Sequence, residues 1–530
     1  MSSTFGSLTT VRLGIYAAQK GLDVTGNNIT NINTNGYTRQ RLDQVSLISS
    51  AADKSASQYN VHVGQGVVIS GLSQLRDPGL DISYRNALSN VGSADQKLAG
   101  LEKLADILDE VGKGDGEQDD GVILNQLNDL RDLINQAITN GTTNYEGAIQ
   151  ASASSLATLL HQYADALQTL QGTFETYLNQ DVDRVNQILN DLRDLNLQIR
   201  DADIRQDPAL ELRDSRNLLL DELSQYMKID VTYSTEDVGA GLMLEKMTVS
   251  LATGDKHTLV EGEYATQLSV DNQNNNYDIV LSALQDEDGQ TMTGSNSVTL
   301  EDTEMYGSLQ SLRELLTEKG EYADATTLAQ DPNAGTKRGI PYYIAALDNF
   351  AREFAEQMNK LNNTQLPGAG NLFSNSGNGD DATGITASNI SISKGWTEGT
   401  VSMQTTADKN ASSDDRTRLA EFLNLFSKDY EFETGAGTIG EATPYKGSFE
   451  DMLLHIQSTL AEDQMATTTV LNNYAITADS IGSDRESVSG VDLNDEATSL
   501  MVYQKAYTAA CRVMTAMEQV LDTLINEMLI

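Results

Sequence analysis

The two ends of the chain carry the same hydrophobic rhythm, and this constrains the fold more than any other feature. Near the N-terminus the stripe has alternating spacings of four and three: Thr4, Leu8, Val11, Ile15, Ala18, Leu22, Thr25 and Ile29. Near the C-terminus the same spacings give Leu493, Ala497, Leu500, Gln504, Tyr507, Cys511, Met514, Glu518, Leu521, Ile525 and Met528. This spacing places one face of a helix against another helix. We therefore expect both ends to be single amphipathic helices of the coiled-coil type.

Only Gln504 and Glu518 interrupt the C-terminal stripe. Burial of one stripe does not offset the backbone entropy that is lost when so long a helix becomes ordered. The two terminal helices are therefore expected to pair with each other, and neighbouring subunits are expected to cover their remaining faces.

The N-terminal stripe leads into an asparagine-rich segment, residues 26–40. Asn and Gly both tolerate positive φ, so the pair Asn35-Gly36 predicts a tight turn at the end of the helix.

Residues 27–39 follow the pattern Asn-Asn-Ile-x-Asn-x-Asn-Thr-x-Gly-Tyr-x-Arg. This pattern resembles the N-terminal signature of the bacterial flagellar axial family, which comprises rod, hook and hook-associated proteins. The continuation Thr38-Arg39-Gln40 resembles the hook-associated protein 1 branch, the hook–filament junction proteins. Residues 489–497 (SGVDLNDEA) and 503–507 (YQKAY) resemble the same branch, and residues 212–217 (LRDSRN) resemble its arginine- and aspartate-rich helix.

The resemblance implies a structural adaptor of the flagellum that assembles as a ring of identical subunits at the tip of the hook. Hook protein would lie below it, a second junction protein and flagellin above it, and an export chaperone would bind it beforehand. It would be extracellular, exported without a cleaved signal peptide. Together with the seams, the resemblance predicts an assembly interface at Leu8, Val11, Ile15, Leu22, Asn28, Ile29, Asn31, Asn33, Gly36, Tyr37, Arg39, Leu493, Leu500, Tyr507, Cys511, Met514, Leu521 and Ile525.

Between the ends, the pattern predicts a mainly α chain with inserted β structure. Residues 77–225 are almost wholly helical in pattern, and a one-residue skip near Tyr177 predicts local unwinding or a change of packing partner. We expect a terminal coiled-coil core (1–60 and 485–530), a long helical bundle shaft (61–227, 301–365 and 448–484) and outer β-rich structure (228–300 and 366–447). Residues 61–70 mix β-branched residues with glycine, which predicts a short hairpin.

Charge and composition restrict the partners. Lys+Arg 35 against Asp+Glu 77 gives a net charge of −42, which repels phosphate and excludes nucleic acid as a ligand. Residues 1–50 are mildly basic, which is either chance or a means of attracting acidic neighbours. No run is long and apolar enough for a membrane span, and the first residues lack the pattern of a secretory signal. The single cysteine, Cys511, excludes an intrachain disulfide.

The sequence contains no complete catalytic motif. The four histidines are scattered, and Ser391-x-x-Lys394 stands without its companion motifs. We therefore expect no enzyme activity, cofactor or metal site. Two alternatives stay open: a hook or distal-rod axial protein, and an adhesin or enzyme domain displayed on an axial scaffold. The β-rich middle is the place for such a domain.

Overall fold

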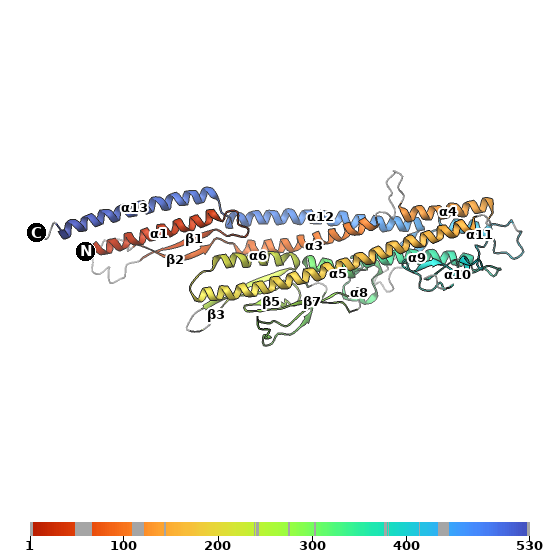
Figure 1. The fold of residues 1–530 in the computed structure, drawn as a ribbon, viewed down its shortest axis with the longest axis horizontal. Coiled ribbons are helices and arrows are strands. Elements are labelled where there is room, and N and C mark those ends of the chain that lie inside the picture. The colour runs from red at the N-terminus through yellow and green to blue at the C-terminus, as the bar shows by residue number, and fades with distance from the viewer. Residues whose placement is uncertain are drawn as a thin grey trace.

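The computed structural model shows an elongated, mainly helical molecule with both termini at one end (Figure 1). It describes residues 4–47, 66–108, 121–141, 145–237, 239, 243–273, 276–301, 304–375, 379, 381–412, 414–432 and 445–526. Among these residues, no helix combines the length and the apolar character needed to cross a membrane.

The two ends of the chain form one unit, which we call the terminal unit. Its elements are helices α1 (Thr4–Thr30) and α13 (Leu493–Asn526) and strands β1 (Gln40–Ser46) and β2 (Val67–Gln74). The two helices lie side by side, and the strands run beneath them (Figure 1). The predicted pairing of the terminal helices is thus confirmed.

The strand pair of the terminal unit differs from the predicted hairpin. Strand β2 pairs antiparallel with β1, from Gln40 opposite Gln74 to Ser46 opposite Val67. Residues 61–65 of the predicted hairpin lie outside the described residues. The hairpin partner is a strand that the sequence did not suggest, because β1 reads Gln-Arg-Leu-Asp-Gln-Val-Ser and lacks a run of β-branched residues.

The shaft is built mainly of helices that run along the length of the molecule (Figure 1). They are α3 (Pro78–Leu108), α5 (Glu146–Ile204), α6 (Leu210–Tyr226), α7 (Gly307–Thr317), α9 (Ile340–Asn362) and α12 (Phe449–Ser489). Helix α5 is 59 residues long. Helix α12 begins with a capping box in which Ser448 and Asp451 satisfy each other's backbone amides.

Small sheets pack along α5. Strands β3 (Ile229–Asp237), β4 (Met243–Leu251), β5 (Thr258–Glu261) and β6 (Tyr264–Ala265) form one sheet in that order. Strands β7 (Leu268–Asp271), β8 (Asp278–Leu281) and β9 (Val298–Thr299) form a second. All lie within 228–300, where β structure was predicted.

The far end of the shaft carries shorter elements. These are α4 (Val122–Asn140), α10 (Lys394–Thr397), α11 (Thr417–Leu425), and the strand pairs β10 (Phe373–Asn375) with β11 (Ile390–Ile392) and β12 (Tyr430–Phe432) with β13 (Tyr445–Gly447). Helix α8 (Ala325–Gln330) and two 3-10 turns, Gly320–Tyr322 and Ala334–Thr336, lie between α7 and α9 in the chain.

The seam skip near Tyr177 corresponds to a change of packing partner, one of the two predicted explanations. Before it, α5 contacts the far end, where His161 Nε2 lies 2.6 Å from the carbonyl of Ile390. After it, α5 contacts the sheets, where Asn186 donates to the carbonyl of Leu268 at 2.9 Å. The helix itself continues without a break through Tyr177.

The largest cluster of buried apolar side chains among the described residues runs from Leu101 to Leu460 and includes the strands of both β-rich segments. None of its members belongs to the terminal unit. The terminal unit is therefore not held to the shaft by a shared apolar core, so other contacts must fasten it.

Candidate functional site: the joint between the terminal unit and the shaft

The terminal unit meets the shaft at a polar cluster, which we call the joint. Its members are Asn28, Tyr37, Thr38, Arg39, Gln40, Arg76, Asp214 and Glu496. They come from the end of α1, the loop after it, the start of β1, the entry to α3, helix α6 and the first turn of α13.

Asn28 fixes the return of the chain after α1. Its side chain is 1% exposed. Its Oδ1 accepts hydrogen bonds from the Gln40 amide (3.0 Å) and the Tyr37 hydroxyl (2.8 Å), and its Nδ2 donates to the Gln40 carbonyl (2.9 Å). A side chain amide is needed here because it both donates and accepts. Burial raises the pKa of the Tyr37 hydroxyl, with nearby carboxylates adding to the shift, so that hydroxyl stays a donor.

Thr38 attaches the loop to α6. Its hydroxyl and its backbone amide both donate to Asp214, at 2.6 and 3.1 Å. Burial raises the pKa of Asp214, although the bonds from Thr38 and the charge of Arg76 act against this. Arg76 lies 3.6 Å from Asp214 and 2.9 Å from Asp81. Burial alone would raise the pKa of Asp81, but Arg76 and Arg485 outweigh it and the pKa is lowered.

Arg39 touches both helices that flank the final chain turn. Its amide donates to the Ser489 carbonyl at the end of α12 (2.9 Å). Its Nε lies 2.7 Å from Oε1 of Glu496, whose side chain is 3% exposed. Glu496 sits in the first turn of α13, where a negative charge also interacts favourably with the helix dipole.

A second set of ion pairs ties three shaft helices together beside the joint. Arg85 of α3 lies 2.9 Å from Asp221 of α6. Arg485 of α12 lies 2.7 Å from Asp221 and 3.1 Å from Asp81, and its guanidinium stacks over the Tyr84 ring. The end of α12 is thus held where the chain turns into α13.

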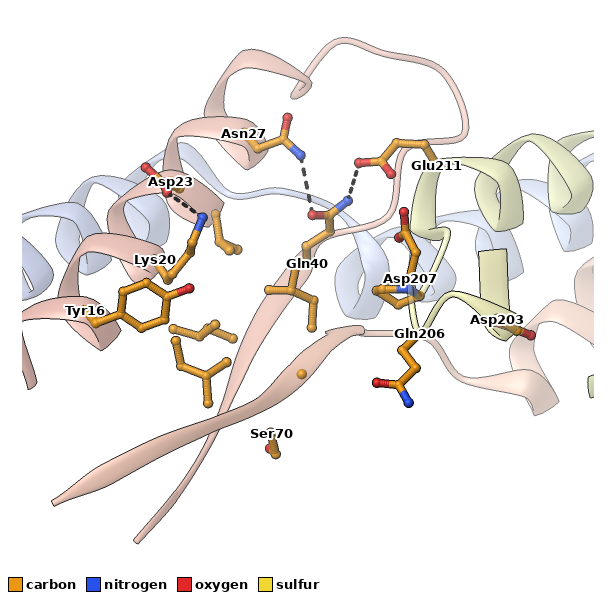
Figure 2. Close-up of a pocket in the computed structure, with 16 residues that line it drawn as sticks. Tyr16, Lys20, Asp23, Asn27, Gln40, Ser70, Asp203, Gln206, Asp207 and Glu211 are labelled. Atoms are coloured by element: carbon orange, nitrogen blue, oxygen red, sulfur yellow. Dashed lines mark hydrogen bonds and ion pairs between the residues drawn. The ribbon is translucent and has the colours of Figure 1, made fainter. Parts of the chain in front are cut away.

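An open cleft of about 930 Å³ separates the terminal unit from the turn between α5 and α6 (Figure 2). Gln40 spans it, since its side chain contacts Asn27 at 3.4 Å and Glu211 at 3.0 Å. Lys20 pairs with Asp23 on one wall, and Asp203 and Asp207 lie on the other side. Apolar side chains such as Val24, Leu42 and Ile69 also line the cleft, and its polar groups include no nucleophile paired with a base.

No set of side chains suited to catalysis appears in this part of the molecule. The described residues contain no group of three or more His, Cys, Asp or Glu side chains placed to hold a metal ion. The geometry instead suits a mechanical role, because buried, mutually satisfied polar groups hold a unique arrangement.

Comparison with known proteins agrees with this picture. Residues 116–375 match the family described as the flagellar hook-associated protein FlgK helical domain, and residues 485–527 match the flagellar basal body rod FlgEFG protein C-terminal family. Flagellar hook-associated protein 1 of Bacillus subtilis is 28% identical over 553 residues, covering 100% of this chain and 99% of the relative. The chain belongs to the flagellar hook-associated protein 1 family.

A further relative and one solved structure are also similar to the chain. Flagellar hook-associated protein 1 of Salmonella typhimurium is 24% identical over 261 residues, covering 48% of this chain and 42% of the relative. The flagellar hook junction protein FlgK from Burkholderia pseudomallei has a similar fold, with a TM-score of 0.54 and 13% identity. That likeness covers 77% of this chain and 100% of the other.

The structure brings the signature residues of this hook-associated protein together within one chain. Asn28, Tyr37 and Arg39 belong to the joint. Asn31 Nδ2 donates to Asn27, and its Oδ1 accepts from Thr34, so it holds the loop. Gly36 adopts φ +77° against Leu218 of α6, which confirms the turn predicted at this residue. Asn33 is exposed and lines a groove beside the loop.

The seam residues occupy the terminal helices with different degrees of cover. Leu8, Val11, Ile15, Leu22 and Ile29 are half-buried on α1, and Leu500, Cys511, Met514 and Leu521 are half-buried on α13. Leu493 and Tyr507 are exposed, at 54% and 37%. The side chain of Ile525 lies outside the described residues.

The contact between the helices is rotated slightly from the predicted stripe. On α1 the buried positions are Ala17, Ala18, Gly21, Val24, Thr25 and Asn28. On α13, Tyr503 and Met517 are half-buried where the predicted stripe had Gln504 and Glu518, which are exposed. The two polar interruptions of the stripe therefore lie beside the contact face, one residue off it.

The predicted interface included Asn28, Tyr37 and Arg39, but it left out the other members of the joint and the pairs that all of them form. Thr38 and Asp214 are 176 residues apart, and Arg39 and Glu496 are 457 apart. Asp214 lies in the segment 212–217 whose resemblance to the family was visible, and that was the available signal. Nothing in the local pattern singled out Arg76, Arg85 or Arg485.

Proposed function

We propose that this chain is a structural subunit of the bacterial flagellum that assembles at the hook tip and forms the hook–filament junction. The observation that carries this proposal is the similarity along the whole chain to a flagellar hook-associated protein 1. The architecture supports it, because both termini form one helical unit that is fastened to a long shaft by the joint.

The exposed side chains of the terminal unit support an assembly role. Val502 and Val520 on α13 are both 58% exposed, and Tyr16 on α1 is 55% exposed. Large apolar side chains so accessible on a chain of net charge −42 are suited to burial against neighbouring subunits. The predicted interface positions Leu493 and Tyr507 lie on the same unit and remain proposed contacts.

The joint gives this assembly role a mechanism. Each subunit would pack its terminal unit into the axial core, and the joint would hold the shaft at one orientation relative to that core. The proposed domain division follows: terminal core, helical shaft, and β-rich segments on the outside. Because buried charge pairs tolerate few geometries, they suit a fixed angle better than an apolar contact does.

The proposed position at the hook tip determines which proteins the chain would contact. A ring of identical subunits would sit on hook protein, with a second junction protein and flagellin above, after chaperone-assisted export without a cleaved signal. In this proposal the chain is structural and not an enzyme. No observed feature favours the displayed enzyme or adhesin domain.

A deletion strain tests the proposal. We expect it to make hooks without attached filaments, and gold-labelled antibody should mark the chain only at hook tips in purified hook–filament preparations. Label along the hook or in the rod would support the alternative of a hook or distal-rod protein. Full-length filaments on the hooks of the deletion strain would contradict the proposal.

A further inference from the structure

The second half of α12 carries the most exposed apolar side chains of the shaft. From Gln464 onward this helix rests on α3 along one narrow line, through buried Thr467 and Ala478. On the opposite side, Met465 is 67% exposed and Ile476 is 69% exposed, the two highest values among the large apolar side chains of the described residues. Figure 1 shows α12 along the edge of the shaft.

These two side chains belong to a continuous outward ridge, which we define as Met465, Thr469, Asn472 and Ile476. The spacings of four, three and four keep them on one helix face. The hydroxyl of Thr469 donates to the Met465 carbonyl at 2.9 Å, so this residue turns its polar atom onto its own helix. The neighbouring Thr468 and Thr477 do the same, at 2.7 and 2.8 Å.

The segment is also free of charge. Residues 464–478 contain no Asp, Glu, Lys or Arg, whereas such residues make up 21% of the chain. Two copies of a chain with net charge −42 repel each other over most of their surfaces. An uncharged, exposed and partly apolar ridge is a place where a second copy approaches without that repulsion.

A groove of about 1120 Å³ lies on another flank of the same helix, between α12, α3, α6 and the loop after α1. Its apolar lining includes Leu88, Val91, Leu218 and Ala475. Along α12 the groove extends from Ala475 to Gly490, roughly 22 Å at 1.5 Å per residue. The ridge spans roughly 16 Å between Met465 and Ile476 by the same measure. The ridge is therefore short enough to lie along the groove.

We propose that the α12 ridge of one copy docks into the groove of a second copy, a lateral shaft contact separate from the terminal helices. Ridge and groove are different patches, so the contact is heterologous and repeats from subunit to subunit around a ring. The ridge adds no charge beside the six charged residues that line the groove, which are Arg76, Asp221, Glu222, Asp479, Arg485 and Glu486. This inference rests on the proposed function, because it assigns a contact within the proposed ring.

Cross-linking tests the contact directly. Two full-length variants are made, both with Cys511→Ser. The first also carries Ile476→Cys, and the second carries Leu218→Cys. The two are mixed, assembled on isolated hooks and mildly oxidised. We expect a disulfide-linked dimer of the two chains. A partner with Ile204→Cys in place of Leu218→Cys is the matched control, since Ile204 is 50% exposed but lies outside the groove. Equal dimer yield with the control, or no dimer on occupied hooks, would overturn the proposal.

Charge insertion gives a second readout. The double substitution Met465→Asp with Ile476→Asp changes two exposed positions, so the helix content by circular dichroism should be retained. We expect at least a tenfold drop in the amount bound to hooks, with Ile204→Asp unaffected. Loss of binding without the cross-link would mean that a different protein covers the ridge, which overturns the second copy as occupant. Normal binding of the double variant would overturn the contact itself.

The failure of the proposed function has a different signature. If the wild-type chain does not bind hooks, that function fails, and the mixed chains are then oxidised free in solution at high salt, which screens the repulsion. A specific Ile476–Leu218 dimer there would still support the contact. Its absence would overturn both proposals.

Discussion

At the scale of single residues, the side chains of the joint have hydrogen-bond donors and acceptors that match those of the groups around them. Asn28 uses both its acceptor and its donor, and Thr38 donates twice to one carboxylate. The asparagine-rich signature is therefore more than a helix terminator. It supplies the side-chain amide of Asn28, which bonds to the backbone amide and carbonyl of Gln40 where the chain turns from α1 into β1.

The substitution Asn28→Ala should loosen this return. It removes three hydrogen bonds and leaves the Gln40 amide without its acceptor, which costs about 1–3 kcal/mol for a buried group. Hydrogen exchange at the Gln40 amide should become faster than in the wild type. Asn33→Ala is the control, because Asn33 is exposed. Unchanged protection of Gln40 would show that Asn28 does not hold the turn.

Asp181 on α5 predicts a pH dependence of stability. Burial raises its pKa to about 6, so folding favours its protonated form. Its stabilising effect is complete below the unfolded pKa near 4 and is lost as pH rises through about 6. The melting temperature of Asp181→Asn minus that of the wild type should grow between about pH 4 and pH 6 and level off above. The same substitution at an exposed neighbour, Asp183→Asn, is the matched control, and a pH-independent difference for Asp181→Asn would contradict this assignment.

At the scale of elements, the spacing of apolar residues predicted the helices and strands better than the types of polar residue predicted the contacts between them. The pairing of the terminal helices, the helical character of residues 77–225 and the β structure after residue 228 follow from local patterns, because a stripe or an alternation depends only on residues close together in the chain. The joint could not be predicted in this way, since its partners are brought together only by folding. Tyr503 of α13 packs closely against Gly21 of α1. A search for apolar residues at helical spacing could not find this contact, because glycine has no apolar side chain.

That glycine, Gly21, gives a test of the α1–α13 contact. A Cβ at this position would lie 2.5 Å from ring atoms of Tyr503, whereas a Cβ on Gly14 meets nothing within 4 Å. Both Gly→Ala changes gain helix propensity, about 1 kcal/mol. Gly14→Ala should therefore stabilise α1, while overpacking of about 1–3 kcal/mol should make Gly21→Ala neutral or destabilising. Hydrogen exchange along α1 measures both, and equal stabilisation would show that the helices do not pack so closely.

At the scale of the whole molecule, the chain behaves as two bodies with different kinds of cohesion. The shaft and its sheets share one apolar cluster, which resists deformation because it is close-packed. The terminal unit is attached through the joint and its ion pairs. This division is useful in an adaptor, since the angle between an axial unit and an outer body is then set by a few side chains.

The orientation of the two bodies should therefore depend on Arg39 more than on any exposed charge. Spin labels at Val513→Cys on α13 and Ile204→Cys on α5, with Cys511→Ser, report the distance between terminal unit and shaft. Both label sites are exposed, at 45% and 50%. The parent chain should give one narrow distance distribution.

Arg39→Ala removes the bond to buried Glu496 and leaves that carboxylate without its 2.7 Å partner, so the distribution should broaden. Arg41→Ala removes an exposed pair with Asp43, which contributes little, and should leave the distribution narrow. A narrow distribution in Arg39→Ala would mean that the remaining contacts, Thr38 with Asp214 and Arg39's own backbone with Ser489, fix the angle by themselves.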